Sequence, residues 1–347
     1  MLFNFVPTGI GSLPHSDAAK ASELVLKYLK NIPFWPQLPR RSYLENMGAQ
    51  FAEGLPNVII DEPGKKMFVD TTDIETGLAD FYQHFLDDDI DYFAISPDRA
   101  AGFHAMYKLL ETANRDNISF IKGQVTGPIT FGALLTDKSG TALMHHPELA
   151  DALNKCLIMK ARWQMDRFNR LGLRSIIFLD EPYLMGYGSA YVPLSKETVI
   201  ERISELANTI HNDNGLVGIH CCGNTDWSVI LATPVDILNF DGLGFMNELM
   251  LYGDDLKKFL SRGGIIAWGM VPSTELDKPV AADYIISKLE AGLDALAKKG
   301  IDRELIAGQS ILTPACGLGA LIDINQAEKR LELLVEVSSR YVKKSAH

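Results

Sequence analysis

The stretch SIIFLDEP, residues 175–182, decides the fold expected for this chain. Its first part is a short run rich in β-branched and aromatic side chains, and two carboxylates and a proline end it. An uninterrupted apolar run of this kind is typical of a strand buried on both faces of a parallel sheet. Similar runs recur along the chain, clearly at 216–219, 235–240 and 264–268, and more weakly at 3–9, 58–60, 117–122 and 306–312.

Longer helical patterns lie between these runs. Apolar residues recur three and four positions apart in residues 147–171, 196–212, 281–299 and 325–341. Strands that alternate with helices predict an α/β fold with a parallel sheet.

The length of the chain favours one domain. A (β/α)8 TIM barrel needs about 250 residues, and roughly 400 with insertions. The 347 residues are therefore expected to form a single barrel domain over residues 1–347, although length alone also allows two smaller domains. The Pro- and Arg-rich stretch from about residue 30 to 70 breaks the alternation. We interpret it as an N-terminal insertion that covers one end of the barrel.

Composition restricts the kind of protein. The formal net charge is −11, which argues against nucleic acid as a partner, because its phosphates are bound through Lys and Arg. No run approaches the ~20 apolar residues of a membrane-spanning helix, and the first residues do not resemble a signal peptide. The four cysteines are too few and too unevenly spread for a disulfide framework. We expect a cytoplasmic protein with free thiols and with no nucleic-acid or membrane partner.

Unusual polar residues and glycines follow the predicted strands, at the point where each strand ends. Parallel α/β folds carry their sites at the carboxyl ends of strands, and a barrel brings all of these ends to one mouth. Residues far apart in sequence are therefore expected to meet there. The clusters are residues 9–12, 123–128, 180–182, 220–225 and 314–317.

Two of these clusters predict a metal site. His220 and Cys222 are two residues apart at a strand end, so their side chains point the same way. With Cys316 they supply three of the four ligands that tetrahedral zinc prefers, leaving one position open for a substrate. Cys221, which points the opposite way, and Cys156, on a helix face, are interpreted as buried core residues.

Two further clusters predict contacts to a charged small molecule. Asp180 and Glu181 are carboxylates suited to an ammonium group, and a structural salt bridge is the alternative. Gly11 and Ser12 offer backbone N–H groups ahead of a helix, which suits a carboxylate or a phosphate, although a plain turn explains them equally well.

Taken together, these motifs resemble the C-terminal catalytic barrel of cobalamin-independent methionine synthase. The similarity extends to the wider superfamily of uroporphyrinogen decarboxylase and the methylcobalamin:coenzyme M methyltransferases. It covers nearly the whole chain, but the second, N-terminal barrel of such methionine synthases is absent. The matching segments are residues 8–12, 122–128, 179–182, 219–224 and 312–318.

The resemblance implies a set of zinc ligands. His220, Cys222 and Cys316 match the zinc-binding His and two Cys of the family. Asp241 occupies the position of the family's carboxylate ligand, which is a Glu, and an Asp is one methylene shorter.

The resemblance also implies a substrate site. Ile10, Gly11 and Ser12 match the segment that holds the carboxylate of homocysteine. Asp180, with Glu181 beside it, matches the acid that binds its ammonium group and is the implied catalytic residue. A second ammonium-binding Glu of the family has no counterpart, and the expected substitute is Asp73 or Glu75.

The reaction implied is zinc-dependent methyl transfer to a small thiol, homocysteine to methionine, by a thiol methyltransferase. The HxCGNT motif at 220–225 is closer to the coenzyme M enzymes, so the expected donor is methylcobalamin or a methylated corrinoid protein. A methylcobalamin:coenzyme M-type methyltransferase is one alternative. A porphyrin-type decarboxylase, a lyase with Arg40 and Arg41 as carboxylate ligands, is another. A non-catalytic carrier of zinc or a corrinoid is the third.

Overall fold

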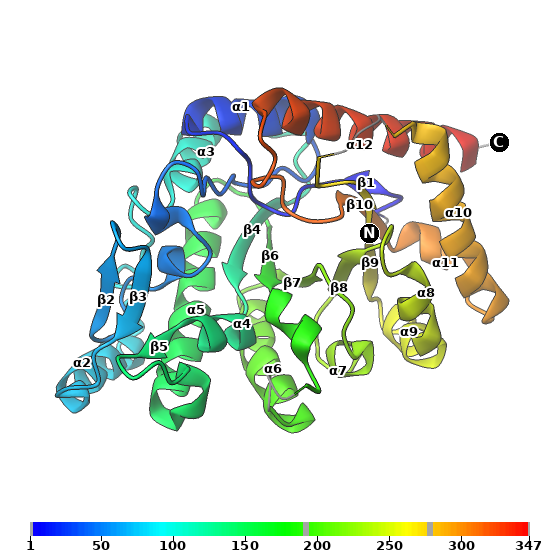
Figure 1. Cartoon of the computed structure of the whole chain (residues 1–347). Coiled ribbons are helices and arrows are strands. Elements are labelled where there is room, and N and C mark those ends of the chain that lie inside the picture. The colour runs from blue at the N-terminus through cyan, green and yellow to red at the C-terminus, as the bar shows by residue number, and fades with distance from the viewer. Residues whose placement is uncertain (1–2, 190–193, 276–279, 346–347) are drawn as a thin grey trace.

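Seven parallel strands form a sheet that curls through the centre of the protein, with helices on its outside (Figure 1). The computed structural model describes residues 3–189, 194–275 and 280–345. The strand order is β1-β10-β9-β8-β7-β6-β4, so the first strand lies beside the last. The strands are β1 (Val6–Pro7), β4 (Ile121–Thr126), β6 (Ser175–Asp180), β7 (Leu216–Cys221), β8 (Ile237–Asp241), β9 (Ile265–Val271) and β10 (Ser310–Pro314).

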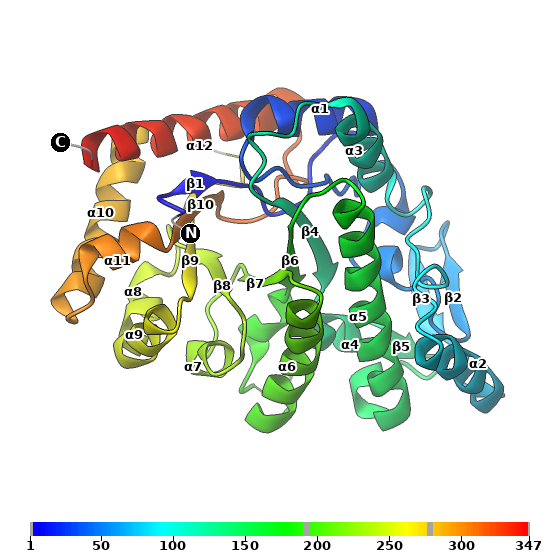
Figure 2. The same ribbon diagram turned by 180° about the vertical axis from the view of Figure 1, so that it is seen from behind.

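Helices follow the strands and surround the sheet, as the view from behind also shows (Figure 2). The four helices predicted from periodicity are present, with ends that differ by four residues or fewer. They are α5 (Pro147–Asn169), α6 (Lys196–Asn212), α10 (Ala282–Lys298) and α12 (Ile324–Ser345). Further helices are α1 (Ala18–Tyr28), α3 (Ala101–Thr112), α4 (Pro128–Leu134), α7 (Trp227–Leu231), α8 (Met246–Leu249), α9 (Gly253–Ser261) and α11 (Arg303–Gly308).

Two strand predictions need correction. The run 58–60 is a strand, β2 (Val58–Asp61), but it belongs to a separate small sheet with β3 (Lys66–Val69) and β5 (Thr136–Asp137). β2 and β3 lie within the expected insertion, whereas α2 (Ile74–Leu86) follows its expected end near residue 70. The run 306–312 divides between the end of α11 and the start of β10. An apolar run of this length does not by itself distinguish helix from strand.

The extended segment 32–37 lies between the two edge strands of the large sheet. It forms parallel bridges from Phe34 to Lys122 of β4, and from Gln37 to Ser12 beyond the end of β1. Two of its residues are prolines, which have no N–H to donate, so it does not form a continuous ladder. The backbone bonds on its two sides are Lys122 N to Pro33 O (2.8 Å), Trp35 N to Lys122 O (3.3 Å), Gln37 N to Gly11 O (2.9 Å) and Leu13 N to Gln37 O (2.9 Å).

Side chains along each strand alternate between the inside of the curled sheet and the surrounding helices, as strand geometry requires. In β6, Ile176 and Phe178 belong to a small inner cluster, whereas Ile177 and Leu179 belong to the large cluster shared with the helices. The inner cluster comprises Ile32, Phe120, Ile176, Phe178, Ile237, Ile265, Ala267 and Ile311. Asp180 is the next inward position of β6, at the carboxyl end of the strands.

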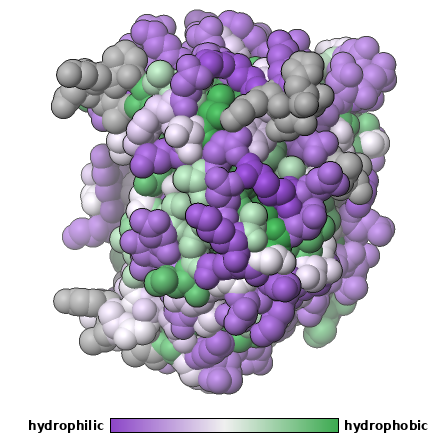
Figure 3. Space-filling model, turned by 90° about the vertical axis from the view of Figure 1, so that its right-hand side faces the viewer, coloured by the Kyte–Doolittle hydropathy of each residue, from purple (hydrophilic) through white to green (hydrophobic). Residues whose placement is uncertain are grey.

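The surface is mostly hydrophilic on the face that Figure 3 shows, with smaller hydrophobic areas between the hydrophilic residues. Over the described ranges of the chain, none of the helices combines the length and the apolar character that crossing a membrane requires. The parallel sheet and the helices around it confirm the prediction of an α/β fold with a parallel sheet.

Candidate metal centre

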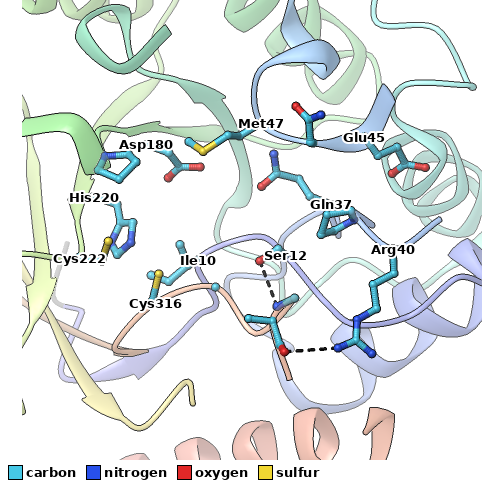
Figure 4. A pocket seen from close by; sticks show the side chains of 16 residues that line it. Ile10, Ser12, Gln37, Arg40, Glu45, Met47, Asp180, His220, Cys222 and Cys316 are labelled. Atoms are coloured by element: carbon cyan, nitrogen blue, oxygen red, sulfur yellow. Dashed lines mark hydrogen bonds between the residues drawn. The ribbon is translucent and has the colours of Figure 1, made fainter. Parts of the chain in front are cut away.

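Three potential metal ligands lie together at the carboxyl ends of the strands (Figure 4). His220 and Cys222 come from the end of β7, and Cys316 follows β10 by two residues. The ligand atoms of the three side chains all lie within 4.8 Å of one another. Cys221, between two of them, points outward and is buried in the large core cluster, as its position in the strand predicted.

The hydrogen bonds of His220 leave one ring nitrogen free for a metal. Its Nδ1 contacts Oδ1 of Asn239 on β8. The side-chain amide of Asn239 donates to Ala267 O and Thr313 Oγ1, both at 2.8 Å, so its oxygen is the acceptor and Nδ1 of His220 carries the proton. Nε2 of His220 is buried without a partner. A second hydrogen bond that fixes the tautomer in this way is usual for a metal-ligating His.

The two thiols lie close enough to shift each other's pKa. A hydrogen bond from Cys316, together with nearby His220, lowers the pKa of Cys222 to about 4. The same hydrogen bond raises the pKa of Cys316. Burial lowers the pKa of His220, but Cys222 and Asp180 outweigh burial and the net shift is upward. This donor set, two cysteine sulfurs and an unpartnered imidazole nitrogen, fits zinc.

Asp241, the expected fourth ligand, does not join this cluster. The ligand atoms that lie within 4.8 Å of one another belong to His220, Cys222 and Cys316 alone. Oδ1 of Asp241 instead accepts hydrogen bonds from the backbone N–H groups of Leu243 and Gly244, both at 2.9 Å. The Oδ1 atom of Asp241 therefore caps its own turn, and its role as a fourth ligand stays a prediction.

A cavity of about 560 Å³ opens over the three ligands. His220, Cys222, Cys316 and Asp180 lie on one side of it, and Arg40 lies on the opposite side (Figure 4). The remaining lining residues are Ile10, Ser12, Gln37, Pro39, Glu45, Asn46, Met47, Pro182, Gly317, Gly319 and Ala320. Several of them belong to the insertion, so the insertion forms part of the cavity wall.

Asp180, on the wall of this cavity, and Lys122 are two buried ionisable groups that influence each other. Oδ1 of Asp180 is buried without a hydrogen-bond partner, and burial raises its pKa to about 6 against the attraction of Lys122. Burial lowers the pKa of Lys122 to about 7. The ammonium group of Lys122 donates to Ile10 O and to Gln124 Oε1, and lies 4.4 Å from the ring centre of Phe178. Sequence reasoning missed Lys122, although a Lys within an apolar strand run is itself a signal.

Glu181 does not lie on the cavity, which corrects its prediction as a substrate-binding residue. Its side chain points toward the N-terminus of α4 and is fully buried. Its carboxylate accepts hydrogen bonds from Ile129 N (2.9 Å), Thr130 N (2.8 Å) and Thr130 Oγ1 (2.7 Å). Burial raises the pKa of Glu181 to about 7. Glu181, the second of the two adjacent carboxylates, is a helix cap.

The segment Ile10, Gly11 and Ser12 lies beside the metal ligands. Ile10 and Ser12 line the cavity. Among the described residues, the backbone N–H groups of Gly11 and Ser12 donate no hydrogen bond. Free N–H groups beside the cavity fit the predicted contact to a carboxylate.

Other residues predicted to contact a substrate lie outside the cavity or form contacts within the protein. Asp73 and Glu75 lie at the start of α2, outside its lining, where Gln37 and Asn46 are present instead. Arg40 donates to backbone carbonyls at residues 320–322. Arg41 pairs with Glu45 at 2.8 Å. Both guanidinium groups are occupied by hydrogen bonds or an ion pair within the protein. This argues against the carboxylate-binding role considered for a decarboxylase.

Comparison with known proteins assigns no family. No family model matches the chain, and no curated protein matches it. Among solved structures, it resembles a modular endo-β-1,4-mannanase of glycoside hydrolase family 26 from Cellulomonas fimi, with 14% identity, a TM-score of 0.32, and coverage of 87% of this chain and 70% of that one.

The comparison gives a glycoside hydrolase and no methyltransferase, so the methyltransferase class expected from the sequence is not supported and is not carried further. A likeness with a TM-score of 0.32 carries no argument of its own. A hydrolase reaction is therefore not inferred for this chain either.

Proposed function

We propose that this protein binds one zinc ion through His220, Cys222 and Cys316, and that it holds a small amino thiol in the cavity above these ligands. The observation that carries the proposal is the meeting of three ligand atoms within 4.8 Å at the base of a cavity of about 560 Å³. Three protein ligands leave one position of a tetrahedral ion for a substrate.

The charges around the cavity support an amino acid as the ligand. Oδ1 of Asp180 is buried and unpartnered, as expected of an acceptor for a substrate ammonium group. The unused N–H groups of Gly11 and Ser12 suit a carboxylate. Homocysteine, which the sequence resemblance implies, carries a thiol, an ammonium and a carboxylate.

Different residues of the chain have different roles in binding. When bound, zinc lowers the pKa of a coordinated thiol, so that the reactive thiolate exists at neutral pH. Asn239 holds the ring of His220 in one orientation. Asp180 and the 10–12 segment orient the rest of the substrate, and the walls contributed by the insertion exclude water.

Binding of the thiol can be measured without any assumption about the reaction. We propose to load the protein with Co²⁺ in place of zinc and to titrate it with homocysteine while recording the thiolate-to-cobalt absorption. A rise in this absorption, with tighter binding than for 4-mercaptobutyrate, which lacks the amino group, is the expected result. An unchanged spectrum at saturating homocysteine contradicts the proposal.

What the bound thiolate reacts with has to be found by assay. Thiol binding with no subsequent reaction of the thiol favours a carrier role. Because the two cysteine ligands must stay reduced, we expect the protein to act in the cytoplasm.

We also propose that the sheet closes into a complete (β/α)8 barrel, with segment 32–37 as the remaining strand. Its bridges to Lys122 on one side and to Ser12 on the other support this assignment. Hydrogen exchange tests it: the amides of Lys122 and Gln37, which donate across these two seams, should be as protected as those of β6 and β7. Rapid exchange at either amide contradicts closure.

A further inference from the structure

Cys316 lies in a loop, residues 315–323, that runs along the rim of the cavity. We call it the Cys316 loop. On its inner side it is tied to Ser12. Leu318 N donates to Ser12 O at 2.9 Å, and Gly319 N donates to Ser12 Oγ at 3.2 Å. The approach is close, because a Cβ added at Gly317 would lie 2.2 Å from Ser12 Oγ. The start of the loop is therefore packed closely against Ser12.

On its outer side the Cys316 loop is held by one side chain from the insertion. The guanidinium of Arg40 donates to three consecutive carbonyls, Ala320 O at 3.3 Å, Leu321 O, and Ile322 O at 2.8 Å. Figure 4 shows Arg40 reaching across the rim toward this loop. A planar fork of N–H donors suits adjacent oxygen acceptors, and hydrogen bonds from a charged donor are stronger than neutral ones.

The outer part of the loop has few other anchors. Leu318 and Leu321 are buried, but Ile322 is 75% exposed. Its backbone N–H donates to Glu275 Oε1 at 2.8 Å. The carbonyl groups at 320–322 accept no other hydrogen bond among the described residues outside α12. Without Arg40, these carbonyls lose their side-chain partner.

We infer that Arg40 is a positioning residue for the candidate metal centre: by clamping the carbonyls at 320–322, it keeps Cys316 beside His220 and Cys222. This inference rests on the proposed function for its consequence, zinc retention, but the clamp itself can be tested without metal. Arg40 touches none of the ligands. Zn–S bonds are about 2.3 Å long, so a loop that wanders takes Cys316 out of bonding range.

Arg41 is a matched control. It neighbours Arg40 and carries the same charge, but it bonds to Glu45 at 2.8 Å and to Asp98 O at 3.2 Å instead of to the Cys316 loop. A change of Arg41 to Ala therefore removes the same charge from the same region without releasing the loop.

The first test uses metal-free protein. In a Cys222→Ser background, Cys316 is the remaining half-exposed thiol, because Cys156 and Cys221 are buried. We expect Arg40→Ala to raise the rate of Cys316 alkylation by iodoacetamide several-fold at fixed pH, and Arg41→Ala to leave it unchanged. Equal rates in the two variants overturn the clamp, whether or not the protein binds zinc.

The second test measures zinc affinity by competition with a chelator, in the full chain with both cysteines. Outer-shell changes typically weaken metal binding about 10- to 100-fold, and we expect about tenfold for Arg40→Ala. Arg40→Lys should be intermediate, since one ammonium does not span three carbonyls, and Arg41→Ala should match the wild type.

A double variant separates positioning from general stability. In a Cys316→Ser background, Arg40→Ala should cause no further loss of zinc affinity, because the ligand that it positions is gone. An equal loss in both backgrounds overturns the inference. A wild-type protein that holds no zinc overturns the proposed function instead, while the alkylation rates still decide the role of Arg40.

Discussion

Asp180 and Glu181 are adjacent carboxylates with opposite surroundings. Asp180 faces the inside of the sheet and has an unpartnered oxygen beneath the cavity. Glu181 faces outward and holds the N-terminus of α4. Side-chain direction in and just after a strand decides which residue can meet a ligand. The same alternation separates Cys222 at the metal centre from Cys221 in the core.

Metal content is the first prediction at the scale of single residues. Cys222→Ser and Cys316→Ser should each release most of the zinc, because each removes one of three ligands. Cys156→Ser should not, since Cys156 contacts backbone carbonyls of residues 51 and 53 in the core. Zinc per chain, measured by atomic emission after gel filtration, tests this. Full zinc occupancy in both cysteine variants contradicts the assignment of the metal site.

The Asp180→Asn variant tests the ammonium contact. Loss of a charge-assisted hydrogen bond should weaken homocysteine binding by ~1.5–3 kcal/mol, and zinc content should stay unchanged. Affinity for 4-mercaptobutyrate should not respond, because it has no ammonium group. Equal weakening for both thiols shows a structural role for Asp180.

The same contact predicts a pH dependence. Because burial raises the pKa of Asp180 to about 6, its carboxylate is ionised above that pH and neutral below it. The preference for homocysteine over 4-mercaptobutyrate should therefore shrink as the pH falls through about 6. The ratio of the two dissociation constants at equal zinc loading is the measurement, and Asp180→Asn should abolish its pH dependence.

Glu181→Ala should affect stability and leave the site intact. The variant leaves the buried N–H groups of Ile129 and Thr130 without acceptors. The expected loss is about 2–4 kcal/mol in the free energy of unfolding, measured by urea denaturation. If homocysteine affinity fell with no loss of stability, Glu181 would belong to the substrate site after all.

At the scale of elements, segment 32–37 shows how an irregular strand is held by packing. Phe34 is 1% exposed, and its ring lies against the backbone after β1, where a Cβ at Gly9 would come within 2.1 Å of the ring. Gly9→Ala should cost about 1–3 kcal/mol of stability through overpacking.

Its control is the double variant Gly9→Ala/Phe34→Leu. The smaller side chain makes room for the added methyl group, so the double variant should be destabilised by less than the sum of the two single changes. Additive losses show that the segment does not press against Gly9.

At the scale of the whole molecule, the metal centre joins segments that are distant in sequence. Ligands come from β7 and from the loop after β10, and the insertion completes the wall of the cavity. A ligand that binds only the folded chain stabilises it, by about 2.7 kcal/mol at 100 times its dissociation constant. Chelation should therefore lower the melting temperature by roughly 5 °C.

The stabilisation by zinc should decrease with falling pH. Metal binding requires that both cysteines lose their protons, and the Cys222 thiolate raises the pKa of Cys316 in the metal-free protein. Protons therefore compete with zinc more strongly as the pH is lowered. Calorimetry with and without chelator across pH 5–8 tests this; a constant difference in melting temperature contradicts it.

Much of the architecture was predictable because it is a local property of the chain. Buried strands such as 175–179 are apolar at every position, and helices such as α6 show apolar residues three and four apart. The weak prediction at 117–122 began too early, since β4 starts at Ile121. Strand ends were less certain because hydrogen-bond partners, and not composition, determine where a strand begins.

The sequence alone also determined which residue types carry the candidate site. The spacing of His220 and Cys222, and their place after a predicted strand, are readable from the chain because side chains two apart in a strand share a face. The tertiary structure decided which carboxylate meets the cavity, that Asp241 caps its own turn, and that Arg40 holds the Cys316 loop. These contacts join residues whose separation along the chain carries no periodic signal. They depend on how the sheet curls, which follows from packing across the whole molecule.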